Sequence, residues 1–559
     1  MNPSIARASA LALVALLAQP TPTASGQAAA GLTPSEKSAA SRITAHAIAG
    51  HIQFLSDDLL EGRGPGSRGD GLAQRYIAAQ MKIAGLRPGA TGNSYLQPVP
   101  LVGISTTRPR TVTFSARGRR LSLKNVDDIV MSSGVQKERS TISRAEVVFV
   151  GYGIVAPEHR WNDYKDVDVK GKVVLVMNND PSSDPKLFGG VERLWYGRWD
   201  YKYLQAAKQG AIGAIVIHTT PSAAYPWSVI QSSNDESFEL PAAPGEPRLE
   251  ARMWATEDAS RRIAALGGHD LDKLRAAAET REFRPVPLGT VMSLSLRNKL
   301  TTVKSANVLG LLPGSDPTLK NEVVVLTAHH DHLGIGRPIQ GDSIYNGAID
   351  NASGCAALLT IARAAALGPR PRRSILFMTV AAEEEGLLGS EWYTRHPTFA
   401  PGKIAANLNM DSVNKNGRTT DVGFIGFGKS SLDRQVTAIA HAQGRTVRGD
   451  PQPDRGSFYR SDQFNFARIG VPALYARGGP SYVGRPPGWG EQQIEMYIQR
   501  HYHQPSDEYD ASWDLSGAVE DAQLYLLVAL RVASDPRLPA WKPGDEFEAA
   551  RKAALGAAR

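Results

Sequence analysis

An α/β domain, with a mostly parallel central sheet flanked by helices, is predicted over residues 295–535. Two observations predict it. From residue 300 onward, short apolar runs alternate with segments of helical periodicity, which is the order of elements that builds a parallel sheet covered by helices. Several of these runs lead directly into His, Asp or Glu, and ligands bind beyond the carboxyl ends of the strands in such sheets.

The elements of this domain follow from the pattern of apolar residues. Runs such as Glu322–Leu326 (EVVVL) are continuous, as in strands that are buried on both faces. Strands are expected at residues 322–328, 374–381, 404–410, 420–426 and 471–476. Helices are expected at residues 352–367, 386–396, 430–443 and 514–533. The tail, residues 536–559, is expected to be a short appendage that ends in a helix.

The chain before this domain divides near residue 140. Residues 35–139 are expected to be the N-terminal part of the same domain, because AHAIAGHIQFLSDDLL and GLAQRYIAAQMKIAGL have helical periodicity on either side of the Gly-rich EGRGPGSRGD. Residues 140–290 contain the strand-like AEVVFVGYGIV, GKVVLVMNN and AIGAIVIHT and the helix-like YKYLQAAKQG. They are predicted to form a smaller, inserted α+β or β-rich unit.

Composition and charge indicate a globular protein and argue against nucleic-acid binding. The 559 residues suggest roughly two to four domains, and 42% hydrophobic with 21% charged residues fits a soluble globular protein. The 63 basic and 55 acidic residues give a net charge of +8 without a long basic block. A nucleic-acid partner is therefore not expected.

The N-terminus has the features of a secretory signal peptide, which is predicted over residues 1–26. Arg7 precedes the apolar stretch Ala8–Ala18, and small residues follow it. This stretch is too short to span a bilayer comfortably, and a buried N-terminal helix is the alternative. The single cysteine, Cys355, permits neither an intrachain disulfide nor a lipid-modified cysteine after the signal. We therefore expect an exported protein, periplasmic or extracellular, without a stable membrane anchor.

Side chains that bind metals gather at the ends of the expected strands. They are His329, His330, Asp331 and His332 in TAHHDHLG, Asp350 in YNGAIDNASG, Glu383, Glu384 and Glu385 in AAEEEGLLGS, Asp411 in NLNMDS, and His501 and His503 in RHYHQPSDEY. Each also has an ordinary interpretation, as an acid at a helix start, an N-cap or a turn residue. Together they contain what two zinc ions need: a His and a carboxylate for each ion, a bridging carboxylate, and a spare carboxylate that accepts a proton.

With these motifs the chain resembles the co-catalytic di-zinc aminopeptidase family, which includes glutamate carboxypeptidase-like exopeptidases. The resemblance rests on TAHHDHLG, GAIDNASG, AAEEEGLLGS, NLNMDS and YHQPSD, in this order. It implies the zinc exopeptidase fold for residues 295–535. Residues 140–290 resemble the protease-associated domain that many such enzymes carry as an insertion, on VFVGYGI, VKGKVVLV and GAIGAIVI.

The resemblance implies a role for each ligand. His329 and Asp411 are expected to bind one zinc ion, and Glu384 and His503 the other. Asp350 is expected to bridge the two ions. Manganese or cobalt suits the same ligands, so the identity of the native metal stays open.

Further roles follow from the same resemblance. Glu383 is expected to be the general base that takes a proton from a metal-bridging water, and Asp331 to hydrogen-bond the imidazole of His329. Tyr502 matches a tyrosine that can stabilise the oxyanion, although it can also simply pack. Glu385, at the variable position of the motif, is expected to be solvated.

Two histidines of TAHHDHLG are not expected to be ligands. Alternation in an extended segment puts His329 and Asp331 on one side and His330 and His332 on the other, but it does not choose between the two pairs. The resemblance to the family motif selects His329 and Asp331. His330 is expected to be packed, and His332 to be a loop residue near the site.

The sequence thus predicts a secreted or periplasmic di-zinc aminopeptidase that hydrolyses N-terminal peptide bonds. A carboxypeptidase or dipeptidase of the same fold is the closest alternative, because Arg455, Arg460, Arg477 and Arg485 lie in a segment that can line the pocket and bind a carboxylate. Glutaminyl-cyclase-like chemistry and a non-catalytic, receptor-like binding protein are disfavoured by the full ligand set.

Overall fold

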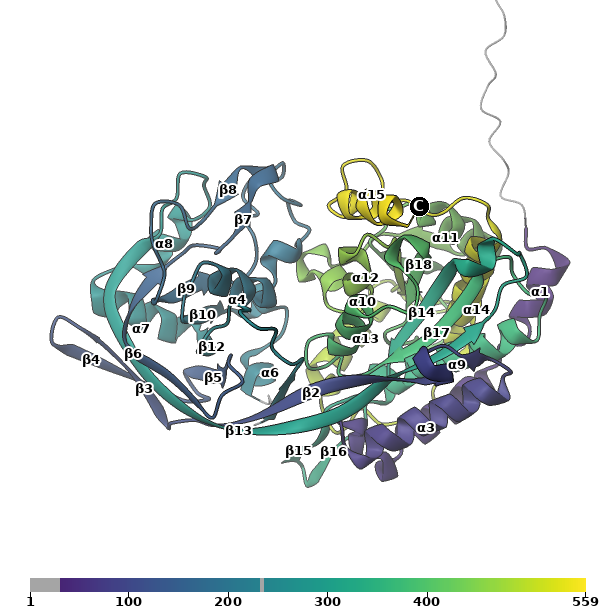
Figure 1. Cartoon of the computed structure of the whole chain (residues 1–559), viewed down its shortest axis with the longest axis horizontal. Helices are drawn as coiled ribbons and strands as arrows, with labels where there is room; N and C mark the ends of the chain where they lie inside the picture. The colour runs from purple at the N-terminus through teal and green to yellow at the C-terminus, as the bar shows by residue number, and fades with distance from the viewer. Residues whose placement is uncertain (1–30, 232–235, 559) are drawn as a thin grey trace, which may run out of the picture.

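Two long strands run through both lobes of the molecule and join them (Figure 1). In this computed structural model they are β2 (Leu96–Thr107) and β13 (Val286–Leu312). The two strands are antiparallel neighbours from Val308, opposite Leu96, to Arg297, opposite Thr107. The lobes are therefore connected by paired strands and not by flexible linkers.

The structure describes residues 31–231 and 236–558. The predicted signal peptide, residues 1–26, lies outside the described residues. Within the described part of the chain, no helix combines the length and the apolar character that crossing a membrane requires.

A mostly parallel sheet forms the centre of the larger lobe, which confirms the predicted fold class. Its strands are β14 (Val323–His329), β17 (Ser374–Val380), β18 (Ile404–Asn409), β21 (Ala473–Gly478), β19 (Asp421–Ile425) and β20 (Thr446–Arg448). β14 lies between β17 and β18 and is parallel to both, and β18 is parallel to β21. β13 and β19 add antiparallel strands beside β17 and β21.

Helices cover both faces of this sheet, which explains its continuous apolar runs. Val324 and Leu326 of β14 pack into the cluster that holds most of the helices, and Val323 and Val325 face the other side. The first face carries α2 (Ala45–Leu55), α3 (Arg68–Ile83), α9 (Gly354–Ala366), α11 (Leu432–Ala442) and α14 (Ser516–Ser534). The second carries α10 (Leu388–Arg395) and α12 (Gln463–Arg468).

The expected strands and helices of this lobe are all present, with ends within two residues of the prediction. The predicted C-terminal helix is α15 (Glu548–Ala557). The sequence did not indicate β20 or α13 (Trp489–Arg500), because these elements are short or largely polar.

The smaller lobe has its own hydrophobic core. Its parallel strands are β6 (Arg139–Phe149), β9 (Val173–Met177), β10 (Gly213–His218) and β12 (Ala251–Thr256), with β5 (Ile129–Ser133) antiparallel to β12. They continue the sheet of the larger lobe through β13. Helices α4 (Trp199–Lys208), α7 (Glu257–Gly267) and α8 (Leu271–Ala277) belong to this lobe (Figure 1). The buried hydrophobic cluster of this lobe includes residues from Val112 to Leu296. The lobe therefore begins before residue 140, and through β13 it extends beyond residue 290.

Candidate metal centre

The carboxyl ends of three parallel strands bring the predicted metal-binding residues together. β14 ends at His329, β17 leads into Glu383 and Glu384, and β18 leads into Asp411. Because these strands are neighbours and parallel, their ends meet at one edge of the sheet.

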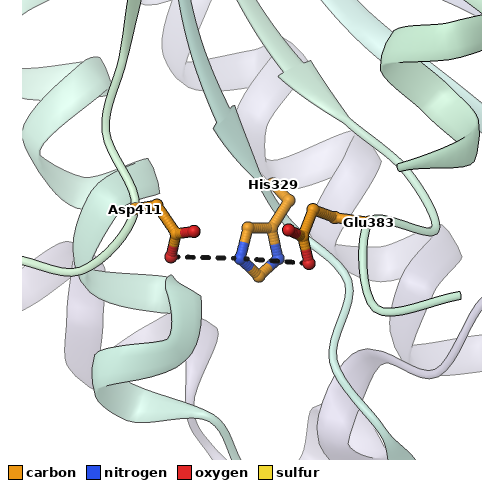
Figure 2. A group of neighbouring side chains, drawn as sticks. All are labelled: His329, Glu383 and Asp411. Atoms are coloured by element: carbon orange, nitrogen blue, oxygen red, sulfur yellow. Dashed lines mark ion pairs between the residues drawn. The ribbon is translucent and has the colours of Figure 1, made fainter. Parts of the chain in front are cut away.

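The imidazole of His329 lies among three carboxylates. Its Nε2 atom is 3.2 Å from Asp350 Oδ1, 3.5 Å from Asp411 Oδ1 and 3.9 Å from Glu383 Oε2. Figure 2 shows the ring between Asp411 and Glu383. His329 is almost completely buried, so these carboxylates face it without intervening bulk solvent.

A second imidazole, that of His503, lies on the other side of Asp350. Its Nε2 atom is 3.0 Å from Glu384 Oε2 and 3.4 Å from Asp350 Oδ2. The two oxygens of Asp350 therefore face different histidines. One ligand atom each of His329, Asp350 and Glu384 lie within 4.8 Å of one another, so the two groups are adjacent.

The chemistry of this donor set fits divalent cations. The Nε2 atoms of both histidines are buried and, within residues 31–231 and 236–558, have no hydrogen-bond partner. Buried carboxylates and imidazoles that lack partners are costly, and a cation between them removes that cost. Imidazole nitrogens with carboxylate oxygens are typical zinc ligands. The residues are thus able to hold two ions that share Asp350.

The neighbouring carboxylates differ in proton affinity. Burial raises the pKa of Glu383 well above its ordinary value, and the carboxylates of Asp411 and Glu384 add to this effect. Burial and Asp350 also raise the pKa of Glu384, but the imidazoles of His503 and His332 outweigh them and hold it at about 2. The site therefore keeps Glu384 ionised while Glu383 binds a proton readily, a separation that suits a ligand beside an acid–base group.

Asp331 acts differently from the prediction. The expected hydrogen bond between its carboxylate and His329 is replaced by a main-chain contact, with His329 Nδ1 3.2 Å from the Asp331 carbonyl oxygen and 3.8 Å from Oδ1. The carboxylate instead accepts hydrogen bonds from the backbone N–H groups of Glu383 (3.0 Å) and Glu384 (3.3 Å). The fully buried carboxylate of Asp331 therefore satisfies two backbone N–H donors of the tight turn after β17.

The other two histidines of the motif have specific partners. His330 is packed, as expected, with Nε2 3.1 Å from Asp70 Oδ1. His332 is fully buried and its Nδ1 atom lies 2.6 Å from Glu384 Oε1. His332 thus orients a predicted ligand. The expectation that Glu385 is solvated is wrong, because its Oε2 atom accepts a hydrogen bond from the backbone of Phe238 at 3.0 Å.

The sequence analysis missed the support that Arg63 gives to this centre. The side chain is fully buried and donates hydrogen bonds to the carbonyl groups of His330 (2.8 Å), Asn346 (2.7 Å) and Gly347 (3.0 Å). The only signal was its place in the Gly-rich EGRGPGSRGD, which by itself indicates a loop. Arg63 thus holds the backbone that follows the predicted ligand His329 and the backbone that precedes the predicted ligand Asp350.

Tyr502 lies against a predicted ligand. Its ring stacks on that of His503, with the centroids 3.9 Å apart. Burial raises the pKa of the Tyr502 hydroxyl, which the positive charges of His503 and Arg460 partly counteract. The hydroxyl is thus neutral at ordinary pH and able to donate a hydrogen bond. His501, in contrast, is bonded to Ser506 and takes no part in the cluster.

Comparison with known proteins agrees with this arrangement. Residues 307–527 match peptidase family M28. Mouse aminopeptidase NAALADL1 is 27% identical over 311 residues, which cover 47% of this chain and 38% of that protein. The maize probable glutamate carboxypeptidase VP8 is 26% identical over 327 residues, covering 52% and 40%. The chain therefore spans about two fifths of the length of these relatives.

A solved structure has the same fold along most of the chain. The aminopeptidase from Aneurinibacillus sp. strain AM-1 superposes with a TM-score of 0.50 at 20% sequence identity. The match covers 91% of this chain and 98% of that one, so both lobes are included.

Proposed function

Because residues 307–527 match peptidase family M28, we propose that the chain is an exported di-zinc aminopeptidase that hydrolyses N-terminal peptide bonds. One observation carries the proposal. The two oxygens of Asp350 face two imidazoles whose buried Nε2 atoms lack hydrogen-bond partners among the described residues. A carboxylate in that position suits a bridge between two ions.

The proposed ligands divide into two groups around Asp350. His329 and Asp411 hold one ion, and Glu384 and His503 the other. Zinc bound there supplies Lewis acidity, which lowers the pKa of a bound water to about 7 and polarises the scissile carbonyl. His332 keeps the Glu384 carboxylate in its position through their 2.6 Å contact.

The remaining chemistry belongs to the protein. Glu383 accepts a proton from the attacking water and passes it to the nitrogen of the leaving amine as the C–N bond breaks. Its raised pKa suits both steps, since the group must hold the proton between them. Tyr502 donates a hydrogen bond to the oxyanion that develops on the carbonyl oxygen when water attacks the carbonyl carbon. Asp331 holds the backbone of Glu383 and Glu384 in place.

A second candidate, a carboxypeptidase, is favoured by one half-buried arginine, Arg460. Arg460 lies beside Tyr502 and has its guanidinium 5.8 Å from the ring centroid of Tyr225, which belongs to the smaller lobe. Among the described residues, no carboxylate forms an ion pair with Arg460. A guanidinium without an acidic partner is suited to a substrate carboxylate. The amino-terminal specificity stays the leading proposal, and the substrate test below separates the two.

Paired substrates and metal analysis test the proposal. The purified protein should contain about two zinc ions per chain and should cleave peptides with a free amino terminus but not their N-acetylated forms. Cleavage of acetylated peptides from the carboxyl end would instead establish the carboxypeptidase. A folded preparation with fewer than one zinc per chain after zinc reconstitution would refute the two-metal centre.

The remaining parts of the proposal concern location and the smaller lobe. We propose that residues 1–26 direct export to the periplasm or the extracellular space, and that residues 140–290 are a protease-associated domain. N-terminal sequencing of the exported protein tests the first point. A mature chain that still begins at Met1 would contradict it.

A further inference from the structure

The loop that carries Glu383 and Glu384 has an unusual backbone. Ala382 and Leu387, on either side of it, have φ angles of +52° and +63°. Residues with a Cβ atom rarely adopt this left-handed conformation, which persists only where the surroundings hold it. The surroundings of residues 382–387 are therefore part of what keeps both glutamates in position.

One side of this loop is held from within the larger lobe. The carboxylate of Asp331 accepts the backbone N–H groups of Glu383 and Glu384, as described above. Glu385 is the next residue, and its side chain points to a different partner. That partner belongs to the smaller lobe.

The smaller lobe reaches the loop through β11 (Glu236–Glu239), which pairs with β2. The backbone N–H of Phe238 donates a hydrogen bond of 3.0 Å to Glu385 Oε2. Beside this bond, Leu240 packs in one apolar cluster with Ala382 and Leu388, and the ring of Phe238 lies against that cluster. The contact thus combines a hydrogen bond to a carboxylate with apolar packing on both ends of the loop.

β11 is itself fixed to the sheet of the smaller lobe. Glu239 forms ion pairs with Arg248, at 2.5 Å, and with Arg252 of β12. Gln136 donates hydrogen bonds to Glu239 (3.2 Å) and to the carbonyl group of Leu240 (2.8 Å). A continuous series of contacts therefore runs from β12 through β11 to Glu385.

We propose that Glu385 is a positioning residue through which the smaller lobe holds the base-bearing loop, residues 382–387, in its working conformation. The carboxylate acts as a hydrogen-bond acceptor for Phe238 and not as a charge near the metal centre. Only the activity measurement below rests on the proposed peptidase function. The position of the loop is measured independently of it.

Amide hydrogen exchange of the zinc-loaded, full-length protein tests this proposal, together with kcat, KM and zinc content. In Glu385→Ala, the amides of residues 382–387 should exchange about tenfold faster, because the buried hydrogen bond from Phe238 is lost. The value of kcat should fall by about the same factor, with KM and zinc content close to wild type. Glu385→Gln keeps an acceptor oxygen and should restore both exchange and kcat. Glu391→Ala, which removes an acid paired with Arg395 on α10, is the matched control and should change neither.

Two results would overturn the proposal. Unchanged exchange in Glu385→Ala would mean that the loop does not depend on β11. If kcat falls and exchange rises as much in Glu385→Gln as in Glu385→Ala, the charge of Glu385 matters and not its hydrogen bond to Phe238. If Glu385→Ala does not fold, Glu239→Ala asks the same question, because it releases β11 from Arg248 and Arg252, and faster exchange at residues 382–387 is again expected. A wild-type protein without peptidase activity would refute the proposed function, while the exchange comparison would still decide the role of Glu385.

Discussion

Replacing Arg63 by methionine tests how the N-terminal helices support the metal centre. Methionine fills much of the volume of the arginine side chain but removes every donor. The carbonyl groups of His330, Asn346 and Gly347 then lose buried hydrogen bonds. The carbonyl group of Leu55 loses a fourth such bond. Hydrogen bonds to a charged group contribute roughly 1.5–3 kcal/mol each, so the four amount to roughly 6–12 kcal/mol.

Part of this loss is offset by the removal of a buried charge. Burial lowers the pKa of Arg63, although Cys355, Asp331 and other acids raise it, so the folded protein disfavours the guanidinium cation. The desolvation of a buried ion costs several kcal/mol. We therefore expect Arg63→Met to lower the free energy of unfolding by about 3 kcal/mol. Because Asn346 and Gly347 precede Asp350 in the chain, zinc affinity should also fall, by about tenfold.

Guanidinium-induced unfolding of the metal-free protein measures the first effect, and competition with a chelator measures the second. Arg68→Met is the matched control, since Arg68 forms only an exposed ion pair with Glu61 at 3.1 Å. That change should alter the stability by less than about 0.5 kcal/mol. If Arg63→Met is as stable as Arg68→Met and binds zinc as tightly, the hydrogen bonds of Arg63 do not support the centre.

Three other predictions test the site and the electrostatics. Glu383→Gln should retain zinc but reduce kcat by about 10²–10⁴-fold, and near wild-type turnover in a pre-steady-state assay would move the base elsewhere. Asp350→Asn should lower the zinc content by at least about one ion per chain, which elemental analysis measures; full occupancy would argue against a bridge. Burial and the charge of Arg363 lower the pKa of His51 from 6.5 to about 4, so on acidification the unfolded chain takes up a proton before the folded one, and stability falls between these values. Over that pH interval, the free energy of unfolding of His51→Gln should fall by about 2 kcal/mol less than that of the wild type, as measured by thermal unfolding. Identical pH profiles of stability would contradict the assignment.

The sequence predicted those parts of the fold that local patterns determine. Continuous apolar runs identify strands such as β14, because burial on both faces leaves no polar alternation. β2 and β13 were not predicted as one pair, since their partners are far apart in the chain and residues 299–304 of β13 are exposed or half-buried, without a clear apolar pattern. Pairing at that distance has no local signal.

The same limit applies to the candidate site. The motifs indicate which residues lie at the strand ends, and the family resemblance divides them into ligands and base. The contacts of Arg63, His332 and Glu385 depend on segments that are distant in sequence, such as Phe238 for Glu385. In the sequence, nothing distinguishes Arg63 from other residues of a Gly-rich loop, or His332 and Glu385 from the neighbouring histidines and glutamates.

Three consecutive glutamates show how surroundings separate side chains of one type. Glu383 lies near Asp411 and has a raised pKa, whereas Glu384 lies between His332 and His503 and has a lowered one. Glu385 faces away to the backbone of Phe238. A shift of register by one residue would exchange these environments, and the Asp331 carboxylate opposes such a shift by binding the N–H groups of two consecutive residues. The register of the AEEEG loop is therefore set by contacts from both lobes, and this favours Glu383 over its neighbours as the base.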